Sequence, residues 1–121
     1  MTHSDFKKKF TLDQRKEECG KMLEKFPERL PLIVEAAPGC KLPIMDRKKF
    51  LVPTDIILGQ FIQIIRKRIS MNQSEALFVF VANDTLCPVT SQLSNIYSSH
   101  KDEDGFLYIT YANENTFGFM N

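Results

Sequence analysis

The sequence predicts a single α+β domain in which helices pack against one small sheet. Hydrophobic spacings typical of helices alternate along the chain with spacings typical of strands, and turn residues separate them. The chain has 121 residues, a length that suits one hydrophobic core. Its composition, 43% hydrophobic and 26% charged, is that of a globular protein, so it excludes wholesale disorder.

Two segments precede the first predicted strand. Residues 1–10 are basic and sparsely apolar, and their composition predicts no regular structure. A helix is expected from Thr11 to about Lys25, because Thr11 and Gln14 have the spacing of a capping box. Pro27 ends this helix, since proline cannot continue it.

The first two strands are expected at 30–35 and 48–52, as an antiparallel hairpin with a long connection. A turn at 38–40 begins that connection. Pro31 cannot donate a hydrogen bond to a neighbouring strand, which predicts that it lies at a sheet edge or at the start of its strand.

The second of these strands has two different sides. Strand alternation puts Lys49 and Leu51 on one side. Phe50 and Val52 then lie on the other. Pro53 follows directly, which argues against an interior position and predicts an edge strand.

The helix predicted at 56–69, capped by Thr54 or Asp55, carries more apolar surface than one face needs. One row suffices to pack on a sheet, and it consists of Leu58, Ile62, Ile65 and Ile69. A second row lies beside it and ends at Arg68; its members are Ile57, Phe61 and Ile64. Two interpretations stay open: a broad core stripe, or a partly open groove with Arg68 at its rim.

The remaining elements complete a mixed sheet. The run at 76–81 is continuously apolar, which is typical of a mid-sheet strand covered on both faces. A short helix is expected around 93–97 and a last strand at 106–111. This order is compatible with the ubiquitin-like β-grasp plan, a four-stranded mixed sheet whose first and last strands are central. The order alone does not compel that topology.

The sequence contains little that would predict catalysis, metal binding or nucleic-acid binding. The net charge is +1, and the basic clusters alternate with acidic ones, so no nucleic-acid partner is expected. Two isolated histidines and three scattered cysteines give no plausible metal spacing, and no cofactor motif is present. Cys87, His100 and Asp102 have the residue types of a thiol protease, but nothing in the sequence activates the thiol. We therefore predict that the chain is not an enzyme.

The cellular compartment follows from similar arguments. Three cysteines without CxxC spacing suit a reducing environment. The sequence has neither the apolar segment of a secretory signal nor a run long enough to span a bilayer. A cytoplasmic location is expected.

The predicted edge strand suggests a docking site. Apolar residues and lysines along an edge are what a peptide needs to add itself as another strand. The alternative is that the basic run at 47–49 only protects an exposed edge from aggregation. From the residues alone, that alternative is the simpler one.

Several segments together resemble the autophagy ubiquitin-like modifier family, in its light-chain-3 and GABA-receptor-associated-protein branches. The matching segments are PLIVE at 31–35, DRKKFLVP at 46–53, IIRKRI at 64–69, ALF at 76–78, KDEDGFLY at 101–108 and TFG at 116–118. They keep one register from about residue 6 to residue 118. Such ordered agreement is far more specific than a short motif.

The resemblance implies a β-grasp core preceded by two helices, so it predicts a short first helix within 1–10. The domain organisation that follows is a helical extension at 1–27, a β-grasp core at 28–112 and a flexible tail at 113–118. Residues 119–121 would be a C-terminal propeptide that is removed by processing.

The family docks receptor peptides of aromatic-x-x-aliphatic type against the second strand, in two adjoining pockets. Carried over by position, the aromatic pocket would use Glu18, Met22, Pro31, Ile33, Lys49, Leu51 and Phe106. The aliphatic pocket would use Phe50, Val52, Pro53, Phe61, Ile64 and Arg68. The resemblance thus favours the docking interpretation of the edge strand and of the second helix row.

The ending at 116–121 carries the chemistry that the family implies. A cysteine protease would cut between Gly118 and Phe119, with Phe117 as the other flank of the site. Activating and conjugating enzymes would then carry the Gly118 carboxylate as thioesters and join it to phosphatidylethanolamine. A covalent lipid would anchor the chain to autophagosomal membranes. Glycine suits these steps because a backbone without Cβ threads narrow clefts.

The resulting hypothesis is a membrane-conjugated modifier that recruits autophagy receptors and cargo adaptors. Tubulin is a further candidate partner of the basic N-terminal segment. An alternative is a β-grasp module that binds peptides or the cytoskeleton and is never conjugated. A third interpretation, a small enzyme that uses Cys87, is the weakest of the three.

Overall fold

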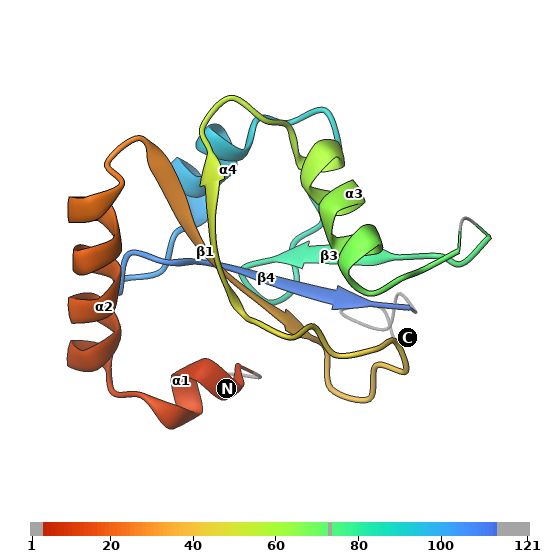
Figure 1. The fold of residues 1–121 in the computed structure, drawn as a ribbon, viewed down its shortest axis with the longest axis horizontal. Helices are drawn as coiled ribbons and strands as arrows, with labels where there is room; N and C mark the ends of the chain where they lie inside the picture. The colour runs from red at the N-terminus through yellow and green to blue at the C-terminus, as the bar shows by residue number, and fades with distance from the viewer. Residues whose placement is uncertain (1–3, 73, 114–121) are drawn as a thin grey trace.

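Four helices surround a four-stranded mixed sheet (Figure 1). The computed structural model describes residues 4–72 and 74–113. Its elements are α1 (Asp5–Lys9), α2 (Leu12–Lys25), β1 (Arg29–Ala36), β2 (Lys49–Pro53), α3 (Leu58–Arg68), β3 (Phe78–Val81), α4 (Leu93–His100) and β4 (Leu107–Ala112). The strand order is β2-β1-β4-β3. The central pair β1 and β4 is parallel, and each outer strand is antiparallel to its neighbour. The first and last strands are thus central, as the β-grasp plan requires.

The N-terminal helices begin where short side chains cap them. In α2 the Thr11 hydroxyl accepts from the Gln14 N–H at 3.1 Å, and the Gln14 side chain accepts from the Thr11 N–H at 2.8 Å. This reciprocal pair is the predicted capping box. Composition alone was wrong about residues 1–10, because Ser4 caps α1 and its hydroxyl accepts from the Lys7 N–H. The short first helix implied by the resemblance is confirmed.

The cap predicted for the third helix is wrong. Neither Thr54 nor Asp55 caps α3; Ile57 takes the cap position, and its N–H donates to the Gln60 side chain at 2.9 Å. The helix begins late because the preceding backbone pairs with the segment before α4. The Leu93 N–H donates to the Ile56 carbonyl at 3.0 Å, and Ile57 and Gln92 form an isolated antiparallel bridge. Such long-range backbone pairing leaves no local trace in the sequence.

The position predicted for the third strand is also wrong. Strand β3 lies at the edge of the sheet, beside β4, and not in its middle. Its continuous apolar run has another cause, which is that both faces are covered. Val79 and Val81 join the core beneath α3, while Phe80 packs with Ala37 and Ala112 on the opposite face. Burial on two faces produces this pattern at an edge as readily as in the middle.

Pro31 lies near the start of β1, although β1 is a central strand. It pairs with Leu51 of β2, whereas the parallel pairing of β1 with β4 begins only at Leu32. The strand-start alternative is therefore correct and the edge alternative is wrong for this proline. The true edge strand of the hairpin is β2, as predicted.

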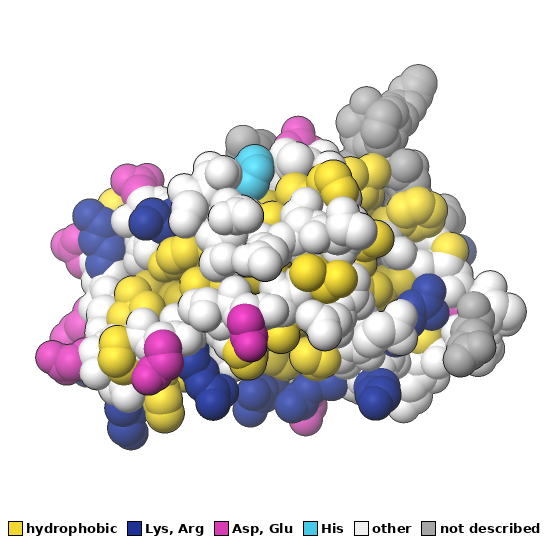
Figure 2. All heavy atoms as spheres, turned by 90° about the horizontal axis from the view of Figure 1, so that it is seen from above, with side chains coloured by type: hydrophobic (Ala, Val, Ile, Leu, Met, Phe, Trp, Pro, Cys, Tyr) yellow, Lys and Arg dark blue, Asp and Glu magenta, His cyan; other side chains and the backbone are white. Residues whose placement is uncertain are grey.

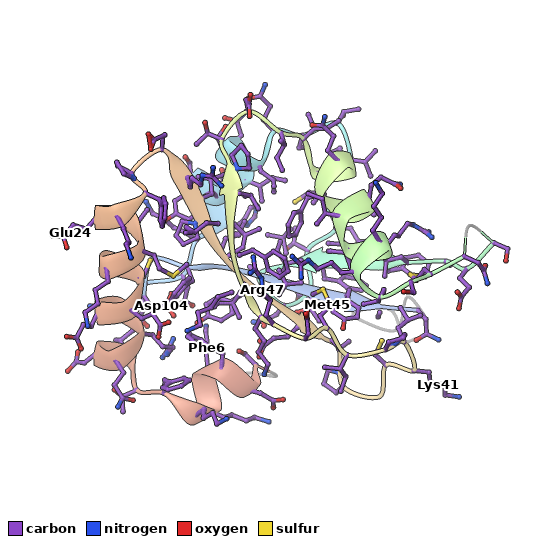
Figure 3. The ribbon with its side chains drawn as sticks, in the orientation of Figure 1. Phe6, Glu24, Lys41, Met45, Arg47 and Asp104 are labelled. Atoms are coloured by element: carbon purple, nitrogen blue, oxygen red, sulfur yellow. The ribbon has the colours of Figure 1, made fainter. Side chains whose placement is uncertain are left out.

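The two main hydrophobic clusters, apart from the group of Phe80, Ala37 and Ala112, lie on opposite faces of the sheet. The larger cluster joins the sheet to α3 and α4, and Phe61 and Ile65 are fully buried in it. The smaller cluster joins the sheet to α1 and α2 and consists of Phe6, Cys19, Ile33, Phe106 and Tyr108. In Figure 3 the Phe6 side chain points from α1 toward the sheet. The two clusters place helices on both sides of β2.

Candidate functional site

The free edge of β2 lies between α2 and α3 (Figure 1). Among the described residues, β2 pairs only with β1, in the register Ile33 with Lys49 and Arg29 with Pro53. Its burial alternates, since Phe50 and Val52 are buried while Lys49 is exposed. A strand with an open edge and two different sides can accept another strand and present each side to different residues of it.

The residues expected at the aromatic pocket meet on the α2 side of β2. Met22 packs against the smaller cluster, in which Ile33 and Phe106 are fully buried. Lys49 extends from β2 to form an ion pair with Glu18 of α2, and its strand partner on β1 is Ile33 of this cluster. Leu51 is half-buried opposite Pro31. The carried-over residues thus combine buried apolar side chains with one partly exposed ion pair.

The residues expected at the aliphatic pocket meet on the α3 side. The rings of Phe50 and Phe61 pack edge to face, with centroids 5.9 Å apart. Val52 joins the same core, and Pro53 ends the strand in an exposed position. Phe61 is fully buried, so the core-stripe interpretation holds for this residue, whereas Ile57 of the same row is only half-buried. Ile64 is 39% exposed and remains available to a ligand.

Two guanidinium groups cover the buried Phe50 ring. The Arg68 carbon Cζ lies 5.2 Å from the ring centroid, and the Arg47 Cζ lies 5.0 Å from it. Arg68 also forms an ion pair with Asp46 at 3.4 Å. Neither Arg47 nor Asp46 was predicted at this site. In the sequence, these two residues appear only as part of a basic run at 47–49 that follows an aspartate. Such a pattern is common on exposed surfaces and does not indicate a binding site.

A buried polar network holds α2 against the sheet. The Asp104 carboxylate accepts from the Arg15 guanidinium at 2.7 Å, from the Tyr108 hydroxyl at 2.6 Å and from the Phe106 N–H at 2.8 Å. Figure 3 shows Asp104 between α2 and the sheet, while Glu24 of α2 points away from the molecule. Burial and the hydrogen bond to Asp104 both raise the pKa of Tyr108, so this hydroxyl remains a donor. A buried carboxylate with this many partners holds α2 in one place.

A second ion-pair group fastens α1 to the same end of the sheet. Asp102 forms an ion pair with Lys7 and lies 3.6 Å from the Arg15 guanidinium. Burial by itself would raise the pKa of Asp102, but the hydrogen bonds and charges of its partners together lower it. Glu35 of β1 accepts from the Ser4 hydroxyl at 2.6 Å and from the Phe6 N–H at 3.0 Å. Both N-terminal helices are therefore held by carboxylates of the sheet region.

The thiol-protease interpretation gains nothing from the structure. Burial raises the pKa of the Cys87 thiol, which is the opposite of what a nucleophile needs. Asp102, its supposed partner, already pairs with Lys7 and Arg15. Within residues 4–72 and 74–113, no three acidic, histidine or cysteine side chains group as metal ligands would.

The surface of the molecule is mixed in charge. Figure 2 shows hydrophobic side chains in small separate groups, with Lys and Arg side chains along the lower edge of that view and acidic side chains among them. This interspersed pattern agrees with the net charge of +1. None of the described helices combines the length and hydrophobicity needed to cross a membrane. The residues Phe117, Gly118 and Phe119 lie outside the described part of the chain.

Comparison with known proteins gives a consistent result. The family model described as "Autophagy protein Atg8 ubiquitin like" matches residues 14–118. Autophagy-related protein 8a of Arabidopsis thaliana is 50% identical over 120 residues, which cover 99% of this chain and 98% of the relative. Autophagy-related protein 8 of Candida glabrata is 48% identical over 117 residues, covering 97% and 98% of the two chains.

A solved structure agrees with this fold. The crystal structure of Trypanosoma brucei ATG8 superposes with a TM-score of 0.85 at 42% sequence identity, covering 92% of this chain and 95% of that one. The α+β ubiquitin-like fold with N-terminal helices is therefore confirmed. Sequence and structure together show that the chain belongs to the Atg8 family, and that it is a ubiquitin-like modifier of autophagy and not an enzyme.

Proposed function

We propose that the chain is conjugated through Gly118 to phosphatidylethanolamine and then recruits receptors that carry aromatic-x-x-aliphatic motifs. In this proposal a cysteine protease first removes residues 119–121 as a propeptide. Activating and conjugating enzymes then transfer the Gly118 carboxylate to the lipid amine. The chain moves from the cytoplasm to the autophagosomal membrane through this covalent anchor. Family membership supports this sequence of steps.

The observation that supports receptor docking is the free edge of β2 between two apolar surfaces. A peptide paired with this edge satisfies its backbone hydrogen bonds on β2 and places successive side chains on alternate sides. Residues three apart in an extended peptide lie on opposite sides, because the side-chain period is two. An aromatic residue thus faces the α2 side while the aliphatic residue three positions later faces Ile64 and Arg68 on the α3 side.

The ion pair between Lys49 and Glu18 acts as the rim of the aromatic pocket. Ile33 and Phe106 beneath it are fully buried, so an aromatic side chain must displace part of this rim in order to reach them. Both ends of the pair are partly exposed, and an exposed pair costs little to open. The pocket is therefore shielded in the free protein and can open when a peptide binds.

The docking proposal is tested with one variant on each side of β2. Leu51→Ala removes apolar surface on the α2 side, and Ile64→Ala removes it on the α3 side. Each should weaken an aromatic-x-x-aliphatic peptide by about 1–2 kcal/mol, the usual cost of truncating a central apolar anchor. Isothermal titration measures the effect, and circular dichroism checks the fold. Phe50 is unsuitable for this test because it is buried against Phe61, so its truncation would also disturb the core.

Val89→Ala is the matched control. Val89 is exposed in the loop before α4, and its truncation removes comparable apolar surface away from β2. Peptide affinity should not change in this variant. Unchanged affinity in both Leu51→Ala and Ile64→Ala would show that peptides bind elsewhere.

A further inference from the structure

A cleft lies at the end of the β2 edge, between α1 and the connection from β1 to β2. Its volume is about 360 Å³, within the range of roughly 300–1,000 Å³ that is typical of ligand pockets. Ala36, Cys40, Ile44 and Met45 contribute apolar surface, and Lys8 and Lys48 lie at its mouth. None of the pocket residues implied by the resemblance lines this cleft.

The cleft is continuous with the free edge of β2. The Val34 N–H donates to the Lys48 carbonyl at 2.9 Å, so the paired backbone extends one residue beyond Lys49. Lys48 itself lines the cleft. A chain that leaves the β2 edge at Lys49 therefore passes directly over Lys48 and meets the cleft.

The direction of a docked peptide decides which of its ends reaches the cleft. Along β2, Lys49 of the aromatic pocket comes first and Pro53 of the aliphatic pocket comes last. A peptide with the aromatic residue before the aliphatic residue must run parallel to β2. Its residues ahead of the aromatic position therefore travel past Lys48 toward the cleft.

The cleft offers both an apolar surface and an available positive charge. Ile44 is 81% exposed, which is unusual for an isoleucine on a stable surface. The Glu35 carboxylate at the cleft is already used by Ser4, Phe6 and Lys48, and Lys48 also lies 3.8 Å from Asp5. Lys8 is exposed and has no ion pair within the described ranges, and Lys9 lies beside it. The unpaired charge at the mouth is thus positive.

We infer that this cleft binds the N-terminal extension of the receptor peptide, taking an apolar side chain against Ile44 and an acidic one near Lys8. The inference rests on the proposed docking at β2. Each residue of an extended peptide advances by about 3.3 Å, so the apolar side chain lies several residues before the aromatic position. The cleft thus selects among receptors that share the same core motif.

Peptides of three kinds test this inference by isothermal titration. The first kind contains only the aromatic-x-x-aliphatic core, and the second adds an acidic extension with one leucine, placed at each upstream position in turn. The third has serine in place of that leucine. In at least one position the leucine peptide should bind about five- to tenfold more tightly than its serine counterpart. Equal affinities at every position would overturn the inference.

Variants of the protein locate the effect. Ile44→Asn should abolish the difference between leucine and serine peptides and leave the core peptide's affinity unchanged. Val89→Asn, at another exposed apolar residue, should preserve the difference. Lys8→Gln should lower the affinity of both peptides with acidic extensions about two- to fourfold at low salt. Lys41→Gln is its control, because Lys41 belongs to the connection from β1 to β2 that borders the cleft but points away from the molecule in Figure 3.

The outcomes separate this inference from the groove itself. If Ile44→Asn still binds the leucine peptide more tightly than the serine peptide, the extension binds elsewhere. That result would overturn the inference but leave the proposed groove intact. Failure of the core peptide to bind would overturn the proposed groove, and the inference with it. Methyl signals of Ile44 should shift with the leucine peptide and not with the core peptide. If they shift instead when the free protein is diluted, a second copy of the chain occupies the cleft and the inference is wrong.

Discussion

At the residue scale, Lys49 is a strand residue on the β2 edge and, in the proposed docking, a charge at the rim of the aromatic pocket. Its backbone groups are unaffected by side-chain substitution, whereas its ammonium group pairs with Glu18. Replacing the side chain should therefore separate strand pairing from charge recognition. Peptides that differ only in the charge ahead of the aromatic residue can report the two contributions.

Lys49→Ala should affect acidic and neutral peptides differently. It removes a positive charge and leaves Glu18 unpaired, so peptides with acidic residues ahead of the aromatic position should lose about 0.2–1 kcal/mol. Peptides with neutral residues there should change less. The difference should shrink between about 0.01 M and 0.15 M salt, because salt screens exposed charges. Isothermal titration at both salt concentrations measures it.

The exposed Lys101, which follows α4, provides the control substitution Lys101→Ala. That variant should not distinguish the two peptides. Equal losses for both peptides in Lys49→Ala, at both salt concentrations, would mean that the aliphatic part of Lys49 contributes and its charge does not.

Gly105 is required by its conformation and by its neighbour. Its φ is +96°, and a Cβ built there would lie 2.7 Å from the Cys19 sulfur. Gly105→Ala should therefore lower the free energy of unfolding by about 1–3 kcal/mol, as measured by urea denaturation. In the double variant with Cys19→Ala, the contact between the new Cβ and the sulfur is removed, while the backbone strain at residue 105 remains.

Gly20 is the matched comparison for this prediction. It lies within α2, and a Cβ there would meet nothing within 4 Å. Gly20→Ala should stabilise the protein by about 0.5–1 kcal/mol, because alanine favours helix interiors. A stability loss at Gly20, or none at Gly105, would contradict this account of the two glycines.

At the scale of elements, local patterns predicted the structure where local interactions determine it. The capping box predicted the start of α2, and alternation predicted the two sides of β2, because neighbouring residues produce both signals. The errors at Ile57 and at β3 have a different origin. Pairing of residue 56 with residue 93, and coverage of Phe80 by Ala37 and Ala112, depend on residues distant in sequence.

The candidate site shows the same limit. The hydrophobic row on α3 was visible in the sequence, but periodicity could not show that Phe61 is core while Ile64 is open. The positions of Arg47 and Arg68 over Phe50 depend on how the long connection returns to β2. No periodic pattern encodes such a path, so these contacts could not be predicted from the residues alone.

The attachment of α1 to the sheet should depend on pH through Asp102. The pKa of this carboxyl is lowered in the folded protein, so its contribution to stability is present above its unfolded pKa of about 3.9. That contribution is lost as the pH falls through the lower, folded value. Urea denaturation between about pH 6 and pH 2 should show the loss in the wild type.

Asp102→Asn isolates this effect, because asparagine does not ionise. The variant should be less stable than the wild type near neutral pH, and the gap should narrow as the pH falls below about 4. Asp84→Asn, in the exposed turn after β3, should follow the wild-type curve. A gap of constant size down to the lowest pH would mean that packing, and not the ion pairs with Lys7 and Arg15, explains the destabilisation.

At the scale of the whole molecule, the sheet separates its two main hydrophobic clusters. One cluster joins α1 and α2 to the sheet, and the other joins α3 and α4 to it. The proposed peptide groove at β2 has α2 on one side and α3 on the other, so receptor binding should depend on the folded domain. Conjugation should depend on Gly118. The two activities are therefore expected to be separable by substitution.

Gly118→Ala tests this separation and the central proposal together. The substituted protein and the wild type are incubated with the activating and conjugating enzymes and with vesicles containing phosphatidylethanolamine, and their lipid adducts are measured by mass spectrometry. We expect an adduct ending at Gly118 for the wild type and none for Gly118→Ala, while both bind the core receptor peptide with equal affinity. A normal amount of lipid adduct on Gly118→Ala, or a wild-type adduct at another residue, would contradict the proposal that this chain is conjugated through Gly118.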